Sequence, residues 1–278
     1  MFWFDGALHD GSIAPVDLID RGLTLGDGLF DTSLARNGRI FLRKAHLDRL
    51  AASAEVLAIP FDATAAARAL DALAAGIGDG VLRLTVTRGG GARGLALPAH
   101  PKPLLFGAAA LVSTGAAFPV LALATSPIRR NETSPAARLK ALPYLDAILA
   151  LRDAASRGAD DVVFENMAGH IACLSVANVF AVFGQRLVTP PLADGVLAGT
   201  VRRLILDQAA SLDFVAEERS MTLAELLAAD AVFATNSVRL LAPCRAIDAT
   251  SFASAEHDGV RRFQAVLRQA IVAECGSR

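Results

Sequence analysis

The apolar positions of the chain repeat at a helical spacing in some segments and at a strand spacing in others, which predicts a mixed α/β (α+β) fold. Apolar residues recur at helical spacing in residues 41–59, and residues 63–75 form a second, alanine-rich amphipathic segment. Residues 81–87 are rich in β-branched side chains and predict a strand. Further helices are expected at residues 140–157, 199–210, 223–229 and 256–275. Further strands are expected at residues 120–125, 161–165, 170–174, 177–183, 187–189, 215–218 and 232–234.

Turn residues near the N-terminus predict two hairpins. Residues 2–9, with 12–14, turn at Asp5-Gly6, and a second turn lies at Asn37-Gly38, a pair that suits a type I′ turn. The stretch between them, residues 20–32, carries glycines on both sides of Asp27. Taken alone, it predicts a tight turn that leads into a strand.

The length of 278 residues suits one large domain or two ordinary ones. Residues 103–128 carry no charge, but glycine, serine and proline interrupt them, whereas a membrane-spanning helix needs about 20 unbroken apolar residues. We therefore expect two strands around a turn and no membrane span. The predicted division is a smaller N-terminal domain at 1–114, an interdomain linker at 115–120 and a larger C-terminal domain at 121–278 that carries Lys140.

Charge and cysteine content narrow the class of function. A formal net charge of −1 argues against nucleic acid or an anionic membrane as a partner held by bulk electrostatics. Cys173, Cys244 and Cys275 are odd in number and lack zinc-binding spacing, as do the scattered histidines. We see no signal peptide at the N-terminus. A reducing, cytoplasmic location and a site without metal are expected.

Only three of the 27 basic residues are lysines. Lys102 lies between two prolines in an expected loop, and Lys44 begins the polar side of a predicted helix. Lys140 alone has small and apolar neighbours that could lower its pKa by desolvation. A neutral ε-amine can form a Schiff base, which a guanidinium cannot. Lys140 is therefore a candidate catalytic residue, the alternative being an ordinary lysine at the start of a helix.

Two further segments have the character of anion-binding sites. The loop Arg88-Gly-Gly-Gly-Ala-Arg-Gly94 can bring backbone N–H groups and two guanidinium groups to an anion, although it lacks the lysine of a nucleotide-binding P-loop. Gly199-Thr200 opens a predicted helix, and the N-terminus of a helix attracts anions.

Six stretches, in the same order and over nearly the whole chain, resemble the class IV aminotransferases. This group, the fold-type IV enzymes of pyridoxal 5′-phosphate (PLP), contains branched-chain and D-amino-acid aminotransferases and aminodeoxychorismate lyase. The six stretches are residues 20–30, 45–50, 140–150, 169–180, 189–202 and 233–243. The resemblance implies the two-domain fold-type IV architecture and a homodimer, with each site between the two domains and edged by the partner subunit. It also implies small amino-acid and 2-oxo-acid substrates.

The resemblance also implies roles for individual residues. Lys140 matches the Schiff-base lysine, which would also move the α-proton of the substrate, and Arg49 matches the arginine that binds the cofactor phosphate. Arg93 corresponds to an arginine that binds the substrate carboxylate. The other implied cofactor-binding residues are Cys173, Asn178, Gly199, Thr200, Val201 and Ser237, and the other implied substrate-binding residues are Phe30 and Thr32.

The sequence departs from the family pattern at Cys173, where the family has a glutamate that contacts the pyridine nitrogen of PLP. A carboxylate there keeps the ring protonated and makes it an electron sink, whereas a thiol is at best a weak donor. Three alternatives follow. The protein could transaminate with a weaker sink, helped by a carboxylate such as Glu165. It could favour elimination, or it could be a former enzyme with a binding role.

Smaller departures concern the substrate. Leu34 stands where the branched-chain branch has an arginine, and Leu95 stands where the D-amino-acid branch has a histidine. The Arg93-Gly94 pair of the lyase branch is present, whereas Tyr144 is one residue away from the tyrosine of the branched-chain branch. We therefore expect amino-group transfer first, an aminodeoxychorismate lyase-type reaction that releases pyruvate second, and a non-catalytic role third.

Overall fold

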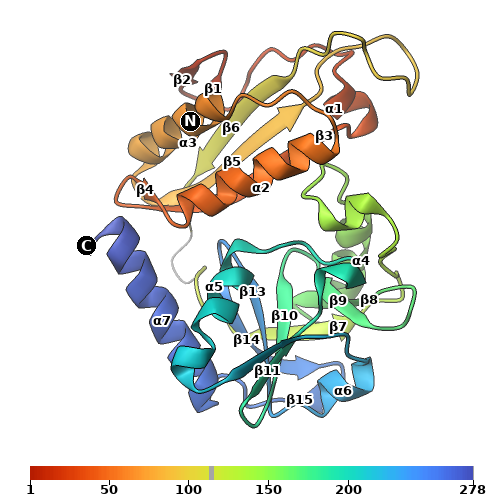
Figure 1. Cartoon of the computed structure of the whole chain (residues 1–278), viewed down its shortest axis with the longest axis vertical. Coiled ribbons are helices and arrows are strands. Elements are labelled where there is room, and N and C mark those ends of the chain that lie inside the picture. Colours follow the sequence, from red (N-terminus) through yellow and green to blue (C-terminus); the bar gives the residue numbers. More distant parts are fainter. Residues whose placement is uncertain (113–115, 278) are drawn as a thin grey trace. The chain divides into compact units, whose positions relative to one another are not determined.

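The computed structural model describes residues 1–112 and 116–277, which form two compact units (Figure 1). Among the described residues, the first unit contains residues 1–112, 139–143 and 271–277, and the second contains residues 116–138 and 144–270. Within this described part, none of the helices is both long and apolar enough to cross a membrane.

The first unit is built on a six-stranded antiparallel sheet in the order β2-β1-β6-β5-β3-β4. Both predicted N-terminal hairpins are confirmed for residues 2–9 and 28–40, and Asn37 and Gly38 have φ values of 50° and 71°, as a type I′ turn requires. The strands are β1 (Phe2–Phe4), β2 (Ala7–His9), β3 (Gly28–Arg36), β4 (Arg39–Ile40), β5 (Gly80–Thr87) and β6 (Leu104–Ala110).

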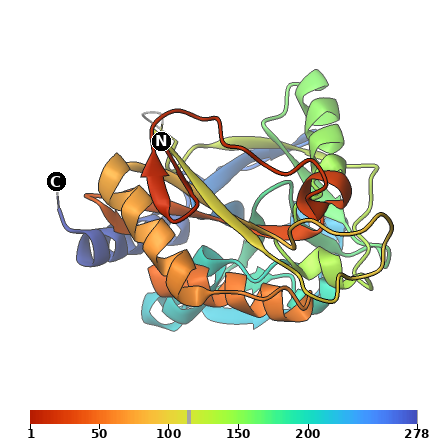
Figure 2. The same cartoon turned by 90° about the horizontal axis from the view of Figure 1, so that it is seen from above.

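Helices α2 (Arg43–Val56) and α3 (Ala63–Ile77) cover one face of this sheet (Figure 2), as their apolar spacing predicted. Leu29 of β3 and Leu84 of β5 belong to the core beneath them. Because side chains alternate along a strand, the intervening positions of β3 and β5 lie on the other face of the sheet.

The stretch predicted as a turn before β3 contains a short helix, α1 (Arg21–Leu25). The Asp20 carboxylate accepts a hydrogen bond from the Gly22 N–H and caps its start, and Gly26 ends it with a φ of 67°. A helix of five residues is too short to show a hydrophobic period, which is why the pattern missed it.

The second unit is built on a mixed nine-stranded sheet in the order β12-β11-β10-β13-β14-β7-β8-β9, with β15 paired to β14. Its strands are β7 (Leu121–Thr125), β8 (Asp161–Glu165), β9 (Ile171–Leu174), β10 (Asn178–Phe183), β11 (Arg186–Thr189), β12 (Val215–Glu218), β13 (Ala231–Asn236), β14 (Leu240–Ile247) and β15 (Thr250–Ser251). Its helices include α4 (Leu145–Ser156), α5 (Thr200–Gln208), α6 (Leu223–Leu227) and α7 (Asp258–Cys275), although α7 belongs to this unit only as far as residue 270. Short 3-10 turns lie at Pro135–Arg138, Leu192–Asp194 and Ala210–Leu212.

Two predictions around Lys140 are corrected. The helix predicted to begin at residue 140 begins at Leu145, because a proline at position 143 disfavours helical geometry in the residue before it. Lys140 lies instead in an extended segment that packs with the first unit, not with the C-terminal domain to which it was assigned. The Phe30 N–H donates to the Lys140 carbonyl at 2.9 Å, and the Leu142 N–H donates to the Gly28 carbonyl at 3.1 Å. The predicted linker at 115–120 falls partly outside the described residues.

Candidate active site

Lys140 lies beside the face of β3 that points away from α2 and α3. Its Nζ atom is 4.5 Å from the centre of the Phe30 ring, and Cζ of Arg83 is 3.6 Å from the same centre. Arg83 lies on β5 directly opposite Thr32, so Phe30, Thr32 and Arg83 share this face. A cation over an aromatic face is attracted by the ring quadrupole. The predicted residues Lys140, Phe30 and Thr32 are therefore brought together, and Arg83 joins them.

The surroundings of Lys140 favour a neutral amine. Burial is the largest influence and lowers the pKa of Lys140 to about 8, with the positive charges of Arg49 and Arg83 acting in the same direction. The Asp31 carboxylate opposes them. Near pH 8, a large fraction of this amine is thus unprotonated and able to act as a nucleophile or a base.

On the opposite face of β3, Asp31 joins two residues of α2. His46 and Arg49 are three residues apart and therefore lie on one side of the helix. The carboxylate of Asp31 lies 2.7 Å from Nδ1 of His46 and accepts hydrogen bonds from Nε and Nη2 of Arg49 at 2.8 and 2.9 Å. Burial raises the pKa of Asp31, but the Arg49 charge and the His46 hydrogen bond outweigh it and lower the pKa to about 2. The carboxylate therefore stays ionised and fixes one edge of the Arg49 guanidinium.

The second unit contains an N-terminal helix end with the features of an anion site. Gly199 precedes α5, and among the described residues no side-chain hydrogen bond caps the helix there. Oγ1 of Thr200 lies 3.4 Å from Oγ of Ser237, and within the described chain the buried Oγ1 of Thr235 has no hydrogen-bond partner. Thr235 lies opposite Asn178 in the pairing of β13 with β10. The N–H groups of Thr200 and Val201 and the hydroxyl groups of Thr200 and Ser237 suit a phosphate.

Asn178 and Gly199 set the position of this helix end. The side-chain amide of Asn178 donates to the Leu197 carbonyl at 2.9 Å. A Cβ atom on Gly199 would collide with the Asn178 amide oxygen. Asn178 therefore holds the backbone just before α5, and the absence of a side chain at position 199 lets the helix end approach it.

Cys173 is a buried thiol on β9, opposite Phe164 of β8. Burial raises its pKa; a positive charge on Arg130 opposes this and the Asp161 carboxylate reinforces it. The group is therefore a neutral thiol and not a thiolate. Glu165, the substitute carboxylate in the first of the three alternatives, forms an ion pair with Arg129 at 3.2 Å.

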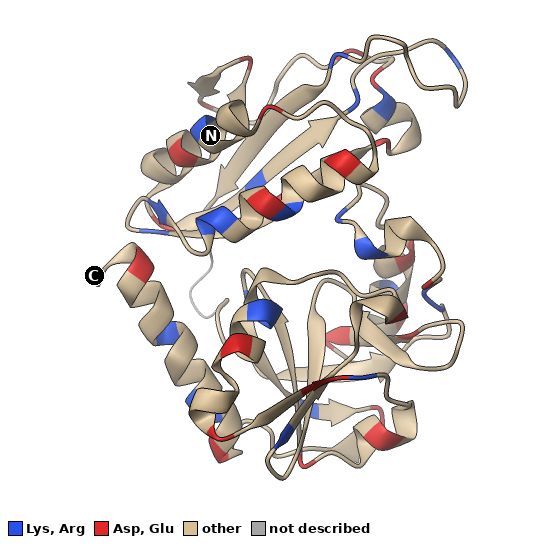
Figure 3. Ribbon diagram, in the orientation of Figure 1, with Lys and Arg blue, Asp and Glu red and all other residues tan. Residues whose placement is uncertain are grey.

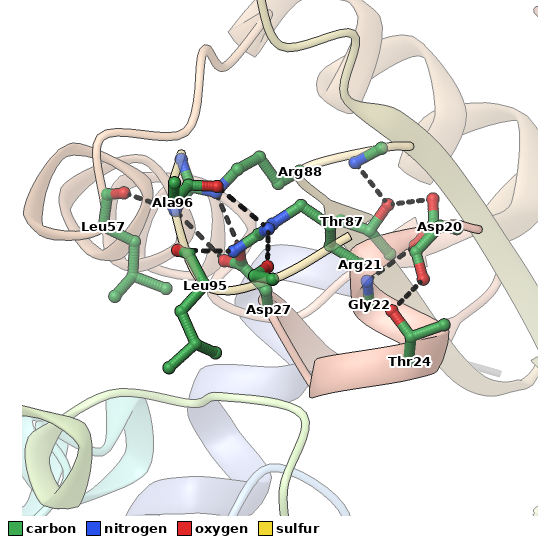
Figure 4. A network of polar contacts seen from close by, with 12 residues as sticks. Asp20, Arg21, Gly22, Thr24, Asp27, Leu57, Thr87, Arg88, Leu95 and Ala96 are labelled. Carbon is green, nitrogen blue, oxygen red and sulfur yellow. Dashed lines mark hydrogen bonds and ion pairs between the residues drawn. The ribbon is translucent and has the colours of Figure 1, made fainter. Parts of the chain in front are cut away.

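The two arginines of the glycine-rich loop have different environments. Arg93 is exposed between β5 and β6, in a loop without regular structure. Arg88 is 4% exposed, and its guanidinium donates to the Asp27 carboxylate and to the carbonyls of Leu57 and Ala58 (Figure 4). The expectation that both arginines are available to an anion is therefore wrong for Arg88, whose donors stabilise the fold.

Acidic and basic positions are interspersed along the ribbon (Figure 3). In the part of the chain that the structure describes, no group of three or more His, Cys, Asp or Glu side chains could hold a metal ion.

Residues 28–247 match the family model described as amino-transferase class IV. In sequence, the chain is 28% identical over 260 residues to the aminodeoxychorismate lyase of Vibrio harveyi, with 90% of this chain and 92% of that protein covered.

Solved structures agree with this match. The 4-amino-4-deoxychorismate lyase of Pseudomonas aeruginosa has a TM-score of 0.87 and 32% identity, with 97% of this chain and 98% of that chain covered. The branched-chain aminotransferase of Thermoproteus uzoniensis, solved with norvaline, has a TM-score of 0.90 and 25% identity, with 98% and 95% covered. The architecture is therefore that of the fold-type IV enzymes.

Proposed function

Since the chain belongs to the class IV aminotransferases, a family of PLP-dependent enzymes, we propose that it transfers an amino group between an amino acid and a 2-oxo acid, with PLP linked to Lys140. The observation that carries this proposal is the buried Lys140 amine with its lowered pKa beside Phe30 and Arg83. An amine with a pKa of about 8 has a larger unprotonated fraction near neutral pH than an ordinary lysine, and the unprotonated form can attack the PLP aldehyde.

The residues present fit this cofactor. When bound, PLP supplies an electron-withdrawing ring that weakens the bonds to the substrate α-carbon. Arg49, with one edge fixed by Asp31, is the proposed guanidinium partner of the phosphate. The N–H groups of Thr200 and Val201 and the hydroxyl of Ser237 are the proposed partners from the second unit. The orphaned Thr235 hydroxyl and the bare backbone at Gly199 support this assignment.

Lys140 has two proposed tasks. It would hold the cofactor covalently, and as a free amine it would take and return the proton of the substrate α-carbon. Asp31 keeps Arg49 in place, and the positive charges of Arg49 and Arg83 help to keep the Lys140 amine in its basic, neutral form.

A substrate carboxylate needs a positively charged partner. Arg93 is proposed for this role, and Phe30 and Thr32 are proposed as lining residues. Arg83, which lies over the Phe30 ring, is a further guanidinium that the sequence pattern did not indicate. Guanidinium groups suit carboxylates because they can offer two parallel N–H donors.

Cys173 supports a second candidate, PLP-dependent elimination that releases pyruvate. A neutral buried thiol cannot keep the pyridine nitrogen protonated as a carboxylate does, and elimination depends less on that proton. The 32% identity to an aminodeoxychorismate lyase points in the same direction. A non-catalytic binding role is the third candidate. The protein is further proposed to be a homodimer and cytoplasmic.

Product analysis separates these candidates. We expect the PLP-loaded protein, given an amino acid and 2-oxoglutarate, to form glutamate and the matching 2-oxo acid, and Lys140→Ala to form neither. Pyruvate from aminodeoxychorismate without an amino acceptor would favour the lyase. If neither product forms over a panel of L- and D-amino acids, the proposed transferase activity is wrong.

A further inference from the structure

The loop that carries Arg93 has little structure of its own. It joins the end of β5 at Thr87 to the start of β6 at Leu104, and the stretch from Ala92 to Leu97 is exposed. No strand or helix is formed within it. Backbone of this kind stays in one conformation only if other groups hold it.

Arg21 supplies these contacts. One of its terminal nitrogens donates to the carbonyls of Gly94 and Ala96 at 3.0 and 3.2 Å, and the other donates to the Leu95 carbonyl at 3.3 Å (Figure 4). For the described chain, the hydrogen bonds to residues 91–103 come from this guanidinium. The Arg21 side chain is thus hydrogen-bonded to three consecutive carbonyls directly after Arg93.

Asp27 fixes the guanidinium in turn. Nε of Arg21 donates to Oδ2 of Asp27 at 2.8 Å, and the Arg21 side chain is 6% exposed. The same carboxylate accepts two hydrogen bonds from Arg88, at 2.7 and 3.0 Å. Burial raises the pKa of Asp27, but the hydrogen bonds from Arg88 and Arg21 outweigh it and lower the pKa. The carboxylate therefore stays ionised and aligns the fork of Arg21 with the loop.

We propose that Arg21, aligned by Asp27, is a positioning residue for substrate binding that holds residues 94–96 so that Arg93 meets the substrate carboxylate in one fixed geometry. This inference rests on the proposed function, in which Arg93 of this loop binds the substrate carboxylate. In this proposal Arg21 acts through the loop, to whose carbonyls its guanidinium is bound.

An arginine is required because the three carbonyls need a planar fork. The guanidinium presents five N–H donors in one plane, and it makes four hydrogen bonds, one to Asp27 and three to the loop. A lysine at position 21 would keep the charge, but its compact ammonium group cannot span the same set of acceptors.

Tryptic cleavage after Arg93 tests the anchor without reference to activity. In the native protein, cleavage of an exposed loop follows the population of its open form. We expect Arg21→Lys to increase the rate of cleavage after Arg93 by on the order of tenfold. Asp27→Asn should act in the same direction and serves as a second variant if Arg21→Lys does not fold. The matched control is Arg43→Gln, which removes an exposed ion pair with Asp71 from the same unit and should leave the rate unchanged.

Kinetics of the PLP-loaded protein test the link to substrate. We expect Arg21→Lys to raise KM for the amino acid by on the order of tenfold with kcat within about twofold, and to leave PLP affinity unchanged. An unchanged cleavage rate would overturn the anchor. Faster cleavage with an unchanged KM, in protein that carries PLP on Lys140, would overturn the positioning role and leave the proposed function intact. A wild type that does not link PLP to Lys140 would refute the proposed function and the substrate role together, while the cleavage rate still decides the anchor.

Discussion

At the scale of single residues, the two faces of β3 contact different groups of the candidate site. Phe30 lies under Lys140 and Arg83 on one face, and Asp31 binds His46 and Arg49 on the other. The same strand therefore places the Phe30 ring beside the Lys140 amine and, through Asp31, fixes Arg49, whose charge helps to lower the pKa of that amine. Because neighbouring residues of a strand point to opposite faces, Phe30 and Asp31 can serve both functions.

The charges around Lys140 predict the pH dependence of its reactivity. In the PLP-free protein, the rate of modification of Lys140 by an amine-reactive reagent should fall as the pH drops through about 8, because the protonated amine is unreactive. Arg83→Gln removes a positive charge that lowers the pKa, so the midpoint should move to higher pH. Peptide mass spectrometry over a pH series measures both. A wild-type midpoint near the ordinary value of 10.5 would refute the assigned environment.

Cys173 predicts a gain of function. Cys173→Glu places a carboxylate at the position proposed to face the pyridine nitrogen, so PLP should bind more tightly and transamination should accelerate, each by on the order of tenfold. Cys173→Gln is the matched control, because glutamine has nearly the same shape as glutamate but carries no charge. Spectral titration with PLP and steady-state kinetics provide the measurements. Equal behaviour of the two variants would mean that charge at this position does not limit the reaction.

At the scale of elements, the approach of α5 to Asn178 shapes the proposed phosphate site. Gly199→Ala would bring a Cβ atom into the Asn178 amide oxygen and displace the helix end. We expect a loss of about 1–3 kcal/mol in the free energy of unfolding, as for other overpacked positions, and weaker PLP binding by on the order of tenfold.

Chemical denaturation and PLP titration check the Gly199→Ala prediction. The double variant Gly199→Ala/Asn178→Ser removes the collision, so its effects should be smaller than the sum of the single ones. Additive effects, or full PLP affinity in Gly199→Ala, would show that α5 does not depend on this contact.

Most helices and strands could be predicted from sequence because their apolar positions repeat with a regular period. Helix α1 is too short for such a period, and β14 was missed since Pro243 within it indicates a break. Lys140 could be found because it is a scarce amine in a family motif. Arg83 could not, because its alternating position in β5 resembles any solvent-facing arginine until the register places it beside Phe30.

At the scale of the whole molecule, the chain divides its proposed chemistry between two units. The first contains Lys140, Arg49, Arg83 and the loop of Arg93, and the second contains Cys173 and the N-terminal end of α5. Local sequence could not assign Lys140 to the first unit, because the contacts to Phe30 and Gly28 that tie it there join segments more than a hundred residues apart.

Reductive trapping tests most directly whether Lys140 is the amine that binds PLP. The protein would be incubated with PLP, reduced with borohydride, digested with trypsin and examined by mass spectrometry. Since Lys44 and Lys102 are the only other lysines, the modified residue can be identified without ambiguity. We predict one PLP group on the peptide of residues 139–152, and its loss in Lys140→Ala. Modification of Lys44 or Lys102 in place of Lys140, or equal incorporation in Lys140→Ala, would contradict the proposed function.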